Sequence, residues 1–255
     1  MSKVEQEAIE TLVAEVDAGL QAASDPERAA AEQRYLKSAL TFLGTSVPQV
    51  RAVVRRLQRG HPSLSRAAVI ALVDALWDAP VHERRLAAVE VMTAYHAVLE
   101  PADMAVVERL CRKAETWALV DPLADTIAGR LIVRWPEAAE MLDRWVRDPE
   151  MWVRRAGLLA LLPSVRRGPK MFERFAGYAD LLLDEREFFI RKAIGWVLRE
   201  VGKRDPERVF VWLAARTDRA SGVSVREAVK YLTPVQREAI LSAYRERRVV
   251  TEESS

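Results

Sequence analysis

The sequence predicts an all-α protein, and three observations support this fold class. Ala, Leu, Arg and Glu, which all favour helices, dominate the 255 residues, whereas glycine occurs only 10 times. No stretch shows the sustained alternation of polar and apolar residues that marks a half-buried strand. Apolar residues instead recur three and four positions apart, which is the spacing of helices buried along one face. Two such stripes are Val69, Leu72, Val73, Leu76 and Ile194, Val197, Leu198, Val201.

The prolines mark expected helix boundaries along the chain. The 12 prolines are spread out, and most intervals between them run from 11 to 37 residues, enough for one or two helices each. Proline is tolerated in the first turn of a helix but not in its interior. We therefore expect a single domain over residues 1–245, with an acidic helical segment over 1–30 and repeats over 31–245. A disordered tail is expected over residues 246–255.

A sequence repeat underlies the helical pattern. A basic residue followed two positions later by Ala, or nearly so, occurs at Arg84, Arg154, Arg191 and Arg226. The gaps between these arginines are 70, 37 and 35 residues. Because the first gap is twice the others, a further copy is expected near residue 119, where the segment TWALVDPLA breaks the pattern.

A period near 36 residues with two helices per unit is typical of HEAT-like repeats, which stack into an α-α superhelix. The alanine lets neighbouring helix pairs pack closely, and the basic position recurs on one common surface. We therefore expect a concave basic face, although ordinary solvated arginines remain the alternative for any one position. The face would include Arg154, Arg155, Arg191, Lys192, Arg226 and Lys230.

The near-neutral net charge conceals a segregation of charges. Lys and Arg number 39 and Asp and Glu 37, for a formal net charge of +2, which excludes a protein that is basic all over. Residues 1–33 hold eight acids and two bases, residues 34–59 hold six bases and no acid, and residues 147–204 hold 13 bases and eight acids. Local basic surfaces are therefore expected.

Several classes of protein are disfavoured by the sequence. No uncharged apolar run approaches 18 residues, so we expect no membrane span. Cys111 is the single cysteine, which excludes an internal disulfide and fits a reducing, cytoplasmic setting. His61, His82 and His96 are scattered and the glycines do not cluster, so we expect neither a metal site nor a bound cofactor.

The chain resembles the AlkD-like DNA alkylation repair glycosylases, which are built from HEAT-like repeats. Five blocks carry the likeness and occur in the family's order over roughly residues 30–235. They are RYLKSALTFLGTSVPQVR from Arg34, LWDAPVHERRLAAVEVM from Leu76, TWALVD from Thr116, MWVRRAGLLALL from Met151 and EFFIRKAIGWVLREVGKRDPERVF from Glu187.

The resemblance implies a monofunctional glycosylase that removes N3- and N7-alkylated purines from double-stranded DNA and so initiates base excision repair. It further implies a monomeric, cytoplasmic, bacterial protein that needs no conventional base-flipping pocket and could accept bulky adducts. The implied catalytic residues are Asp121, Trp117, Trp196 and Arg155. The implied DNA-binding residues are Tyr35, Lys37, Arg51, Arg154, Arg191, Lys192, Arg226 and Lys230.

The chemistry of such a lesion explains why a carboxylate is needed. An N3- or N7-alkylated purine already carries a positive charge and leaves as a neutral base, so no general acid is required. Asp121 could stabilise the growing oxocarbenium character of the sugar and position a water. Trp117 lies four residues earlier, on the same face of a helix.

Each of these assignments has a structural alternative. Asp121 could simply cap a helix that starts at Pro122, and the tryptophans could pack in the core. Arg155 could form a surface ion pair with Asp148 or Glu150. For the whole protein, the alternatives are a non-catalytic binder of damaged or branched DNA and a HEAT-type scaffold for protein interactions.

Overall fold

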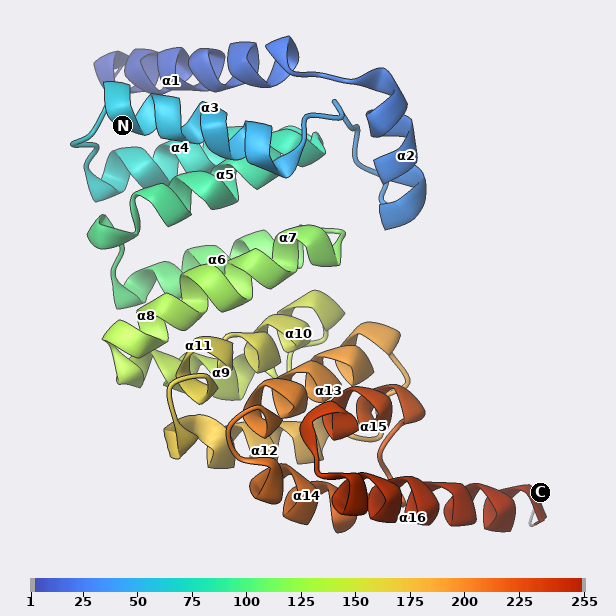
Figure 1. Ribbon diagram of the computed structural model, residues 1–255. Coiled ribbons are helices and arrows are strands. Elements are labelled where there is room, and N and C mark those ends of the chain that lie inside the picture. The colour runs from blue at the N-terminus through green and yellow to red at the C-terminus, as the bar shows by residue number, and fades with distance from the viewer. Residues whose placement is uncertain (1–2, 254–255) are drawn as a thin grey trace. The chain divides into compact units, whose positions relative to one another are not determined.

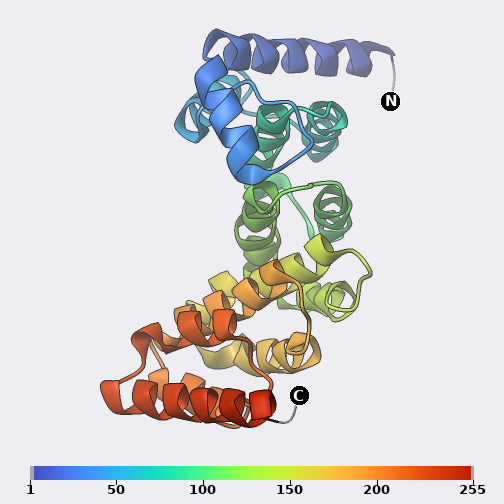
Figure 2. The ribbon, with the colours of Figure 1, turned by 90° about the vertical axis from the view of Figure 1, so that its right-hand side faces the viewer.

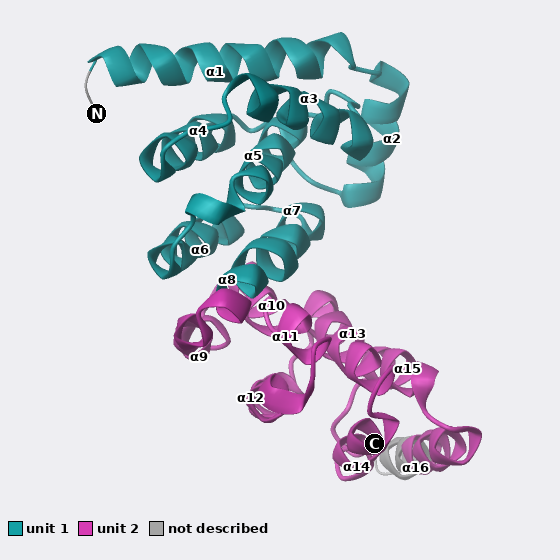
Figure 3. Cartoon of the chain, turned by 60° about the vertical axis from the view of Figure 1, so that its left-hand side comes forward, with its two compact units in different colours: residues 1–131 teal, residues 132–255 magenta. Residues whose placement is uncertain are grey.

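The computed structural model describes residues 3–253, with side chains through residue 246. The chain consists of helices, and within the described residues the only strand-like feature is an isolated parallel bridge between Thr41 and Val81. The predicted all-α class is confirmed. The backbone forms two compact units, residues 1–131 and residues 132–255, which Figure 3 shows in different colours. The single domain expected over residues 1–245 stays a prediction.

Unit 1 contains seven labelled α-helices in chain order, and an eighth contains the boundary with unit 2. Prolines lie in the first turns of α2 and α3, as expected, and Asp25 caps α2 and Ser65 caps α4 through their side chains. The helices are α1 (Lys3–Ala22), α2 (Pro26–Leu36), α3 (Val47–Gly60), α4 (Arg66–Asp78), α5 (His82–Ala94), α6 (Met104–Arg112), α7 (Trp117–Pro122) and α8 (Gly129–Arg134).

The helices of unit 1 form two layers. Helix α3 packs on α5, while α1 packs on α4 in the other layer. Helix α1 forms the outer edge of the unit, and α2 crosses its direction (Figures 1 and 2). The acidic N-terminal segment is therefore helical over Lys3–Ala22, with Ile9, Leu12, Val16 and Leu20 buried against its neighbours.

Unit 2 has the same two-layer design. Helices α10, α13 and α15 lie side by side in one layer, and α9, α12, α14 and α16 make up the other (Figures 1 and 3). The helices are α9 (Glu140–Trp145), α10 (Met151–Leu159), α11 (Leu162–Val165), α12 (Phe172–Leu182), α13 (Phe188–Gly202), α14 (Pro206–Ala214), α15 (Gly222–Ala228) and α16 (Pro234–Glu253).

Helix α16 extends into the segment 246–255, for which the sequence predicts a disordered tail. Residues 254–255, and all side chains beyond residue 246, lie outside the described part of the chain. The order of the tail stays a prediction.

The contacts between side chains repeat with the period read from the sequence. Arg109 pairs with Asp74, Lys192 with Glu227 and Arg219 with Asp184, each across 35 residues. Residues that are one period apart in the sequence lie on neighbouring repeats. These ion pairs therefore join successive repeats within each unit. The three arginines of the repeated step in unit 2 lie on consecutive helices of one layer, because Arg154 belongs to α10, Arg191 to α13 and Arg226 to α15.

One loop of unit 1 is fixed by a buried carboxylate. Glu83 is fully buried and accepts hydrogen bonds from the backbone N–H groups of Leu43 and Gly44, at 2.9 and 2.6 Å. Gly44 has a φ of 78°, and a Cβ there would lie 1.9 Å from the carbonyl oxygen of Asp25. Gly44 therefore lies in a tight turn that only glycine can form without strain.

A second glycine brings two helices of unit 2 together. A Cβ on Gly195 of α13 would lie 2.7 Å from the Cβ of Glu227 and 2.9 Å from the carbonyl oxygen of Ser224, both of α15. The Ser224 hydroxyl donates a hydrogen bond of 2.9 Å to the carbonyl of Arg191 on α13. The missing side chain thus allows α15 to lie directly on α13, which brings Glu227 to the surface of that helix.

Within the described residues, no helix is long and apolar enough to cross a membrane.

Candidate active site

Trp117 and Asp121 share one face of the short helix α7 in unit 1. The helix begins at Trp117, and its N-cap is Thr116, whose side chain accepts a hydrogen bond from the N–H of Ala118. Asp121 is therefore in the last turn of α7, and the alternative that it caps a helix starting at Pro122 is wrong. Four residues separate Trp117 from Asp121, so the helix presents their half-buried side chains on the same side.

The segment after Asp121 departs from regular helix geometry. Pro122 lies inside the helix and has no N–H to donate to the carbonyl of Ala118. The chain continues as a π-helical turn over Leu123–Ala128 before α8 begins. Single π-helical turns are frequent at functional sites. The irregularity falls where the sequence repeat is broken, near residue 119.

Tyr35 is the third candidate residue that unit 1 brings to this place. Its ring, near the end of α2, lies 6.2 Å from the Trp117 ring with an interplanar angle of 85°, an edge-to-face arrangement. The Tyr35 side chain is 72% exposed, so it does not behave as a packed core aromatic. Residues far apart in the sequence thus form an aromatic pair beside the carboxylate of Asp121.

The carboxylate of Asp121 also lies near the buried thiol of Cys111. Burial raises the pKa of Cys111, and the negative charges of Asp121 and Glu108 raise it further. The thiol is therefore protonated at neutral pH and acts as a neutral neighbour of Asp121. Cys111 itself is fully buried and contributes no nucleophile to the surface.

The other predicted DNA-binding residues of unit 1 lie at its surface. Lys37 is exposed and ends α2 in the left-handed conformation, with a φ of 50°. Arg51 of α3 is exposed and pairs with Glu90 of α5 at 2.9 Å. The same helix carries Arg55, Arg56 and Arg59, which are exposed and form no ion pair with any residue that the structure describes. The acid-free sequence from residue 34 to 59 already indicated them.

Arg154 and Arg155 of α10 are the first pair of basic repeat residues in unit 2, and both contact residues of the next repeat. Arg154 pairs with Glu185 at 2.8 Å and donates to the carbonyls of Asp148 and Pro149. Arg155 is only 3% exposed; its guanidinium donates to the carbonyl of Phe189 and lies 5.6 Å from the centre of that ring. The catalytic role that the resemblance implies for Arg155 stays a prediction, and direct contact with DNA requires the guanidinium to leave this position.

The corresponding repeat of unit 1 offers an internal comparison for Arg155. Arg85 occupies the same place in the step that starts at Arg84, and it too is buried. Its guanidinium donates to the carbonyl of Lys113 at 2.7 Å and lies 5.5 Å from the centre of the Trp77 ring. Because Arg85 has no proposed role in chemistry, this shared arrangement indicates that the position first serves to join successive repeats.

Trp196 of α13 is half-buried and lies within a row of basic residues. Lys192 precedes it by four residues, Arg199 follows by three and Lys203 by seven, so all four share one face of the helix. Arg199 and Lys203 were not among the sequence candidates. The helical spacing from Trp196 was the signal that could have found them.

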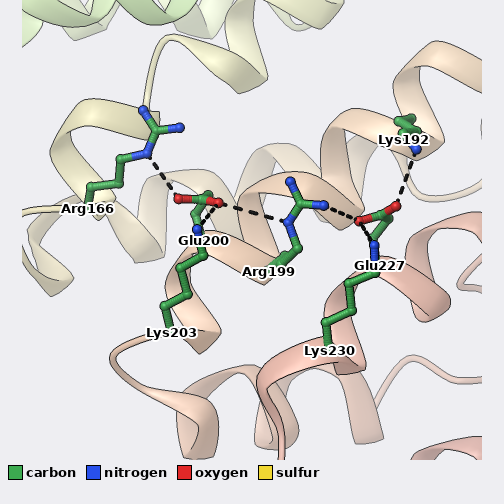
Figure 4. Close-up of polar contacts among 7 residues, drawn as sticks. All are labelled: Arg166, Lys192, Arg199, Glu200, Lys203, Glu227 and Lys230. Atoms are coloured by element: carbon green, nitrogen blue, oxygen red, sulfur yellow. Dashed lines mark hydrogen bonds and ion pairs between the residues drawn. The ribbon is translucent and has the colours of Figure 1, made fainter.

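Two buried glutamates lie between basic side chains in this part of unit 2, as Figure 4 shows. Glu227 of α15 pairs with Lys192 at 3.2 Å, Arg199 at 2.5 Å and Lys230 at 2.8 Å. Glu200 of α13 pairs with Arg166 at 3.1 Å, Lys203 at 2.7 Å and, more weakly, Arg199 at 3.9 Å. We call these seven residues the cation row.

The remaining candidates of unit 2 lie close to this row. Arg191 of α13 donates a hydrogen bond of 2.7 Å to the carbonyl of Glu185, and Arg226 of α15 is exposed. Trp77, Trp145 and Trp212 are buried, as expected of core tryptophans. Among the side chains of residues 3–246, no group of three or more His, Cys, Asp or Glu could hold a metal ion.

The structure therefore gathers the candidates into two groups, one in each unit. The group in unit 1 consists of Trp117 and Asp121, which lie on the irregular helix α7, and Tyr35, which packs against Trp117. Unit 2 contributes Trp196 with the cation row. The first group offers a carboxylate beside aromatic rings, and the second offers exposed cations around a half-buried indole.

Comparison with known proteins gives a consistent picture. The profile of the family described as DNA alkylation repair enzyme matches residues 16–232. The match begins within the acidic N-terminal segment, upstream of the five blocks that carry the resemblance from about residue 30. No curated protein sequence matches the chain.

Three solved structures are similar in fold. A predicted DNA alkylation repair enzyme from Enterococcus faecalis is 20% identical, with a TM-score of 0.75 over 83% of this chain and 97% of that one. AlkD2 from Streptococcus mutans is 16% identical, with a TM-score of 0.58 over 73% and 90% of the two chains. The protein smu.31 from Streptococcus mutans UA159 is 16% identical, with a TM-score of 0.56 over 72% and 100%.

Proposed function

We propose a glycosylase function for this chain, which belongs to the DNA alkylation repair enzyme family. The reaction is hydrolysis of the N-glycosidic bond of cationic N3- or N7-alkylated purines in double-stranded DNA. It releases the alkylated base and leaves an abasic site, which is the first step of base excision repair. The family supports repair of alkylated DNA, and the residues on α7 support this particular reaction.

The proposed reaction needs little help from an acid. The bond between N9 of the purine and C1′ of the deoxyribose breaks, and its electron pair moves onto the base, which cancels the positive charge. C1′ develops oxocarbenium character and is attacked by the oxygen of a water. The water loses one proton, and C1′ retains a hydroxyl group.

Asp121 is the proposed catalytic residue because its carboxylate matches both needs of this path. Its negative charge stabilises the oxocarbenium character, which exists fully only in the transition state. The same carboxylate orients the water and accepts its proton. The short helix α7 holds this carboxylate in a half-buried position. Directly after Asp121, Pro122 and the π-helical turn distort the backbone.

Aromatic rings support the positive charge in the proposed transition state. A ring face near a cation contributes about 0.5–2 kcal/mol. Trp117 shares a helix face with Asp121 and packs edge-to-face with the Tyr35 ring. Trp196 is the proposed aromatic contact from unit 2, where the cation row around it binds DNA phosphates.

The observation that carries the proposal is the pairing of Trp117 and Asp121 on a helix interrupted at Pro122. An anion at this place repels the phosphates of DNA, so direct contact with the DNA backbone does not explain it, whereas stabilisation of a cationic transition state does. The proposed path, as in the family that the chain resembles, uses no pocket that encloses the base, which would permit bulky adducts.

The proposal is tested by incubating the protein with a duplex containing N7-methylguanine and measuring the free base released. We expect Asp121→Asn to lower the single-turnover rate constant about 10²–10³-fold, as removal of one transition-state contact does. Glu115→Gln is the matched control, because it removes an exposed negative charge two residues before Trp117. Its rate should stay within about twofold of the parent, since an exposed charge of this kind contributes little.

The outcomes separate the candidate functions. Release that is unchanged in Asp121→Asn contradicts the role of this carboxylate. Tight binding to duplex DNA without release of any cationic alkylpurine identifies a non-catalytic binder. Neither release nor binding to DNA leaves the scaffold for protein interactions.

A further inference from the structure

The cation row of unit 2 has more positive charge than its own carboxylates can balance. Two glutamates face five basic side chains, so these seven residues together carry a formal net charge of +3. A set of ion pairs that served only to join helices would need no such excess. The members are Arg166, Lys192, Arg199, Lys203, Lys230, Glu200 and Glu227 (Figure 4).

Burial separates the two signs of charge. Glu227 and Glu200 are 9% and 7% exposed, whereas the side chains of Lys192, Lys230 and Lys203 are nearly half exposed. The carboxylates therefore lie below the protein surface, and the lysine cations lie at it. A partner that approaches this surface meets positive charge before it meets any carboxylate.

We propose that Glu227 and Glu200 are positioning residues that hold the five cations as a preformed binding surface for the phosphodiester backbone of DNA. The inference rests on the proposed function, because it takes DNA as the partner. Its new content is that two acids, which repel DNA individually, increase the affinity for DNA by ordering the cations that bind it.

The contacts of Glu227 show how the ordering is achieved. One carboxylate oxygen accepts from Lys192 and the other from Arg199 and Lys230, so a single side chain fixes cations from α13 and from the segment after α15. Arg199 also reaches Glu200, at 3.9 Å, and so joins the two carboxylates. Long basic side chains lose conformational freedom when they bind a phosphate, and a side chain that is already held loses less.

Gly195 makes this arrangement possible. Any larger residue there would collide with the Cβ of Glu227, so only the glycine allows the carboxylate to lie between Lys192 and Arg199. Trp196 follows directly and shares the helix face with both cations. The indole is therefore flanked by charges whose positions are fixed, which would hold the sugar-phosphate backbone beside it.

The test uses Glu227→Gln in the full-length protein with an undamaged duplex, so that it does not depend on base release. The substitution raises the net charge by one, and a simple Coulombic account predicts tighter binding. We expect the opposite. The dissociation constant should rise about three- to tenfold near 0.1 M salt, because ordering each freed side chain again has a cost.

Glu173→Gln is the matched control. Glu173 is an exposed residue of unit 2 that pairs with Arg208 outside the cation row, and its substitution changes the net charge by the same amount. We expect this variant to bind DNA as tightly as the parent or slightly more tightly. If Glu227→Gln binds as tightly as Glu173→Gln, the positioning role is contradicted.

A second variant keeps the proposal testable if Glu227→Gln fails to fold. Lys192→Gln combined with Lys230→Gln removes two exposed cations and should leave the fold intact. The slope of log affinity against log salt concentration should fall in magnitude by up to about 1.8, since each phosphate contact on duplex DNA contributes about 0.9. An unchanged slope overturns the proposed surface. Failure of the wild-type protein to release any base would contradict the glycosylase proposal alone.

Discussion

Each unit of the protein buries a glutamate that accepts several hydrogen bonds, but the partners differ. In unit 1, Glu83 accepts from the backbone of Leu43 and Gly44. Burial raises the pKa of its carboxyl, although these backbone hydrogen bonds oppose the increase. In unit 2, burial also acts to raise the pKa of Glu227, but hydrogen bonds from Lys230 and Lys192 and the charges of Arg199 and Lys192 lower it to about 2.

The difference shows that a buried carboxylate in the same fold can serve two purposes. The carboxylate oxygens of Glu83 accept hydrogen bonds that fix a loop. Its pKa is shifted mainly by burial and by backbone hydrogen bonds. Glu227 uses its charge to hold cations at the surface. We infer a division of labour, in which unit 1 positions the carboxylate of Asp121 and unit 2 provides an ordered basic surface that binds DNA.

The largest expected effect on stability is that of Glu83→Ala. Loss of the carboxylate leaves two backbone N–H groups of the loop without their acceptor, and each such group costs about 1–3 kcal/mol when buried. We expect the free energy of unfolding, measured with chemical denaturant, to fall by roughly 2–4 kcal/mol. A loss below about 0.5 kcal/mol, as is usual for surface substitutions, would show that the loop is held by other contacts.

The two units should also differ in their response to acid. Burial and then the charge of Arg85 lower the pKa of His82, in unit 1, to about 4. The unfolded chain binds a proton near the ordinary value of 6.5, so the stability associated with neutral His82 is present above pH 6.5 and is lost as the pH falls to 4. For Glu227 the corresponding loss occurs between pH 4.5 and 2.

Hydrogen exchange, corrected for the intrinsic pH dependence, can follow each unit separately. We expect the amides around His82 to lose protection between pH 6.5 and 4, by up to roughly 2–3 kcal/mol. Amides of α13 and α15 around Glu227 should keep their protection to lower pH. Earlier loss of protection in α13 and α15 than around His82 would reverse the comparison.

A smaller effect is expected from Gly195→Ala. The added Cβ collides with Glu227 and with the backbone of Ser224, and overpacking of this kind costs about 1–3 kcal/mol. Because α15 must shift, Glu227 moves away from its cations, and DNA affinity should fall as it does in Glu227→Gln. Thermal unfolding and DNA titration measure the two effects.

Gly177→Ala provides the control for this substitution. Gly177 lies in the middle of α12 and is exposed to solvent, and a Cβ there would meet nothing within 4 Å. The change should therefore stabilise the protein by about 0.5–1 kcal/mol and leave DNA binding unchanged. Destabilisation of both variants to the same degree would remove the special role of Gly195.

The sequence predicted the fold well because helices and repeats leave periodic signals. Apolar spacing identified stripes such as Val69, Leu72 and Val73, which are fully buried, and the period of 35–37 residues appears in the ion pairs between repeats. Prolines lie in the first turns of α2, α3, α11, α14 and α16, as expected. Pro122 differs, because it lies inside α7 and the cap of that helix is Thr116, five residues before Asp121.

The contacts of the basic residues could not be predicted in the same way. Arg154 and Arg155 are neighbours in sequence, but only the packing of the next repeat decides that Arg155 is buried against Phe189. The role of Glu227 was missed because two of its three partners, Lys192 and Arg199, lie on another helix. The repeat period could have indicated one of them, since Lys192 lies 35 residues earlier.

The division of labour between the units is tested most directly by measuring two quantities in two variants. The quantities are the single-turnover rate constant for release of N7-methylguanine at saturating protein, and the dissociation constant for duplex DNA. Asp121→Asn should lower the rate constant about 10²–10³-fold and change the dissociation constant less than about twofold. Lys192→Gln with Lys230→Gln should weaken binding at least about tenfold and leave the saturated rate constant within about threefold. Equal losses of both quantities in both variants would contradict the account.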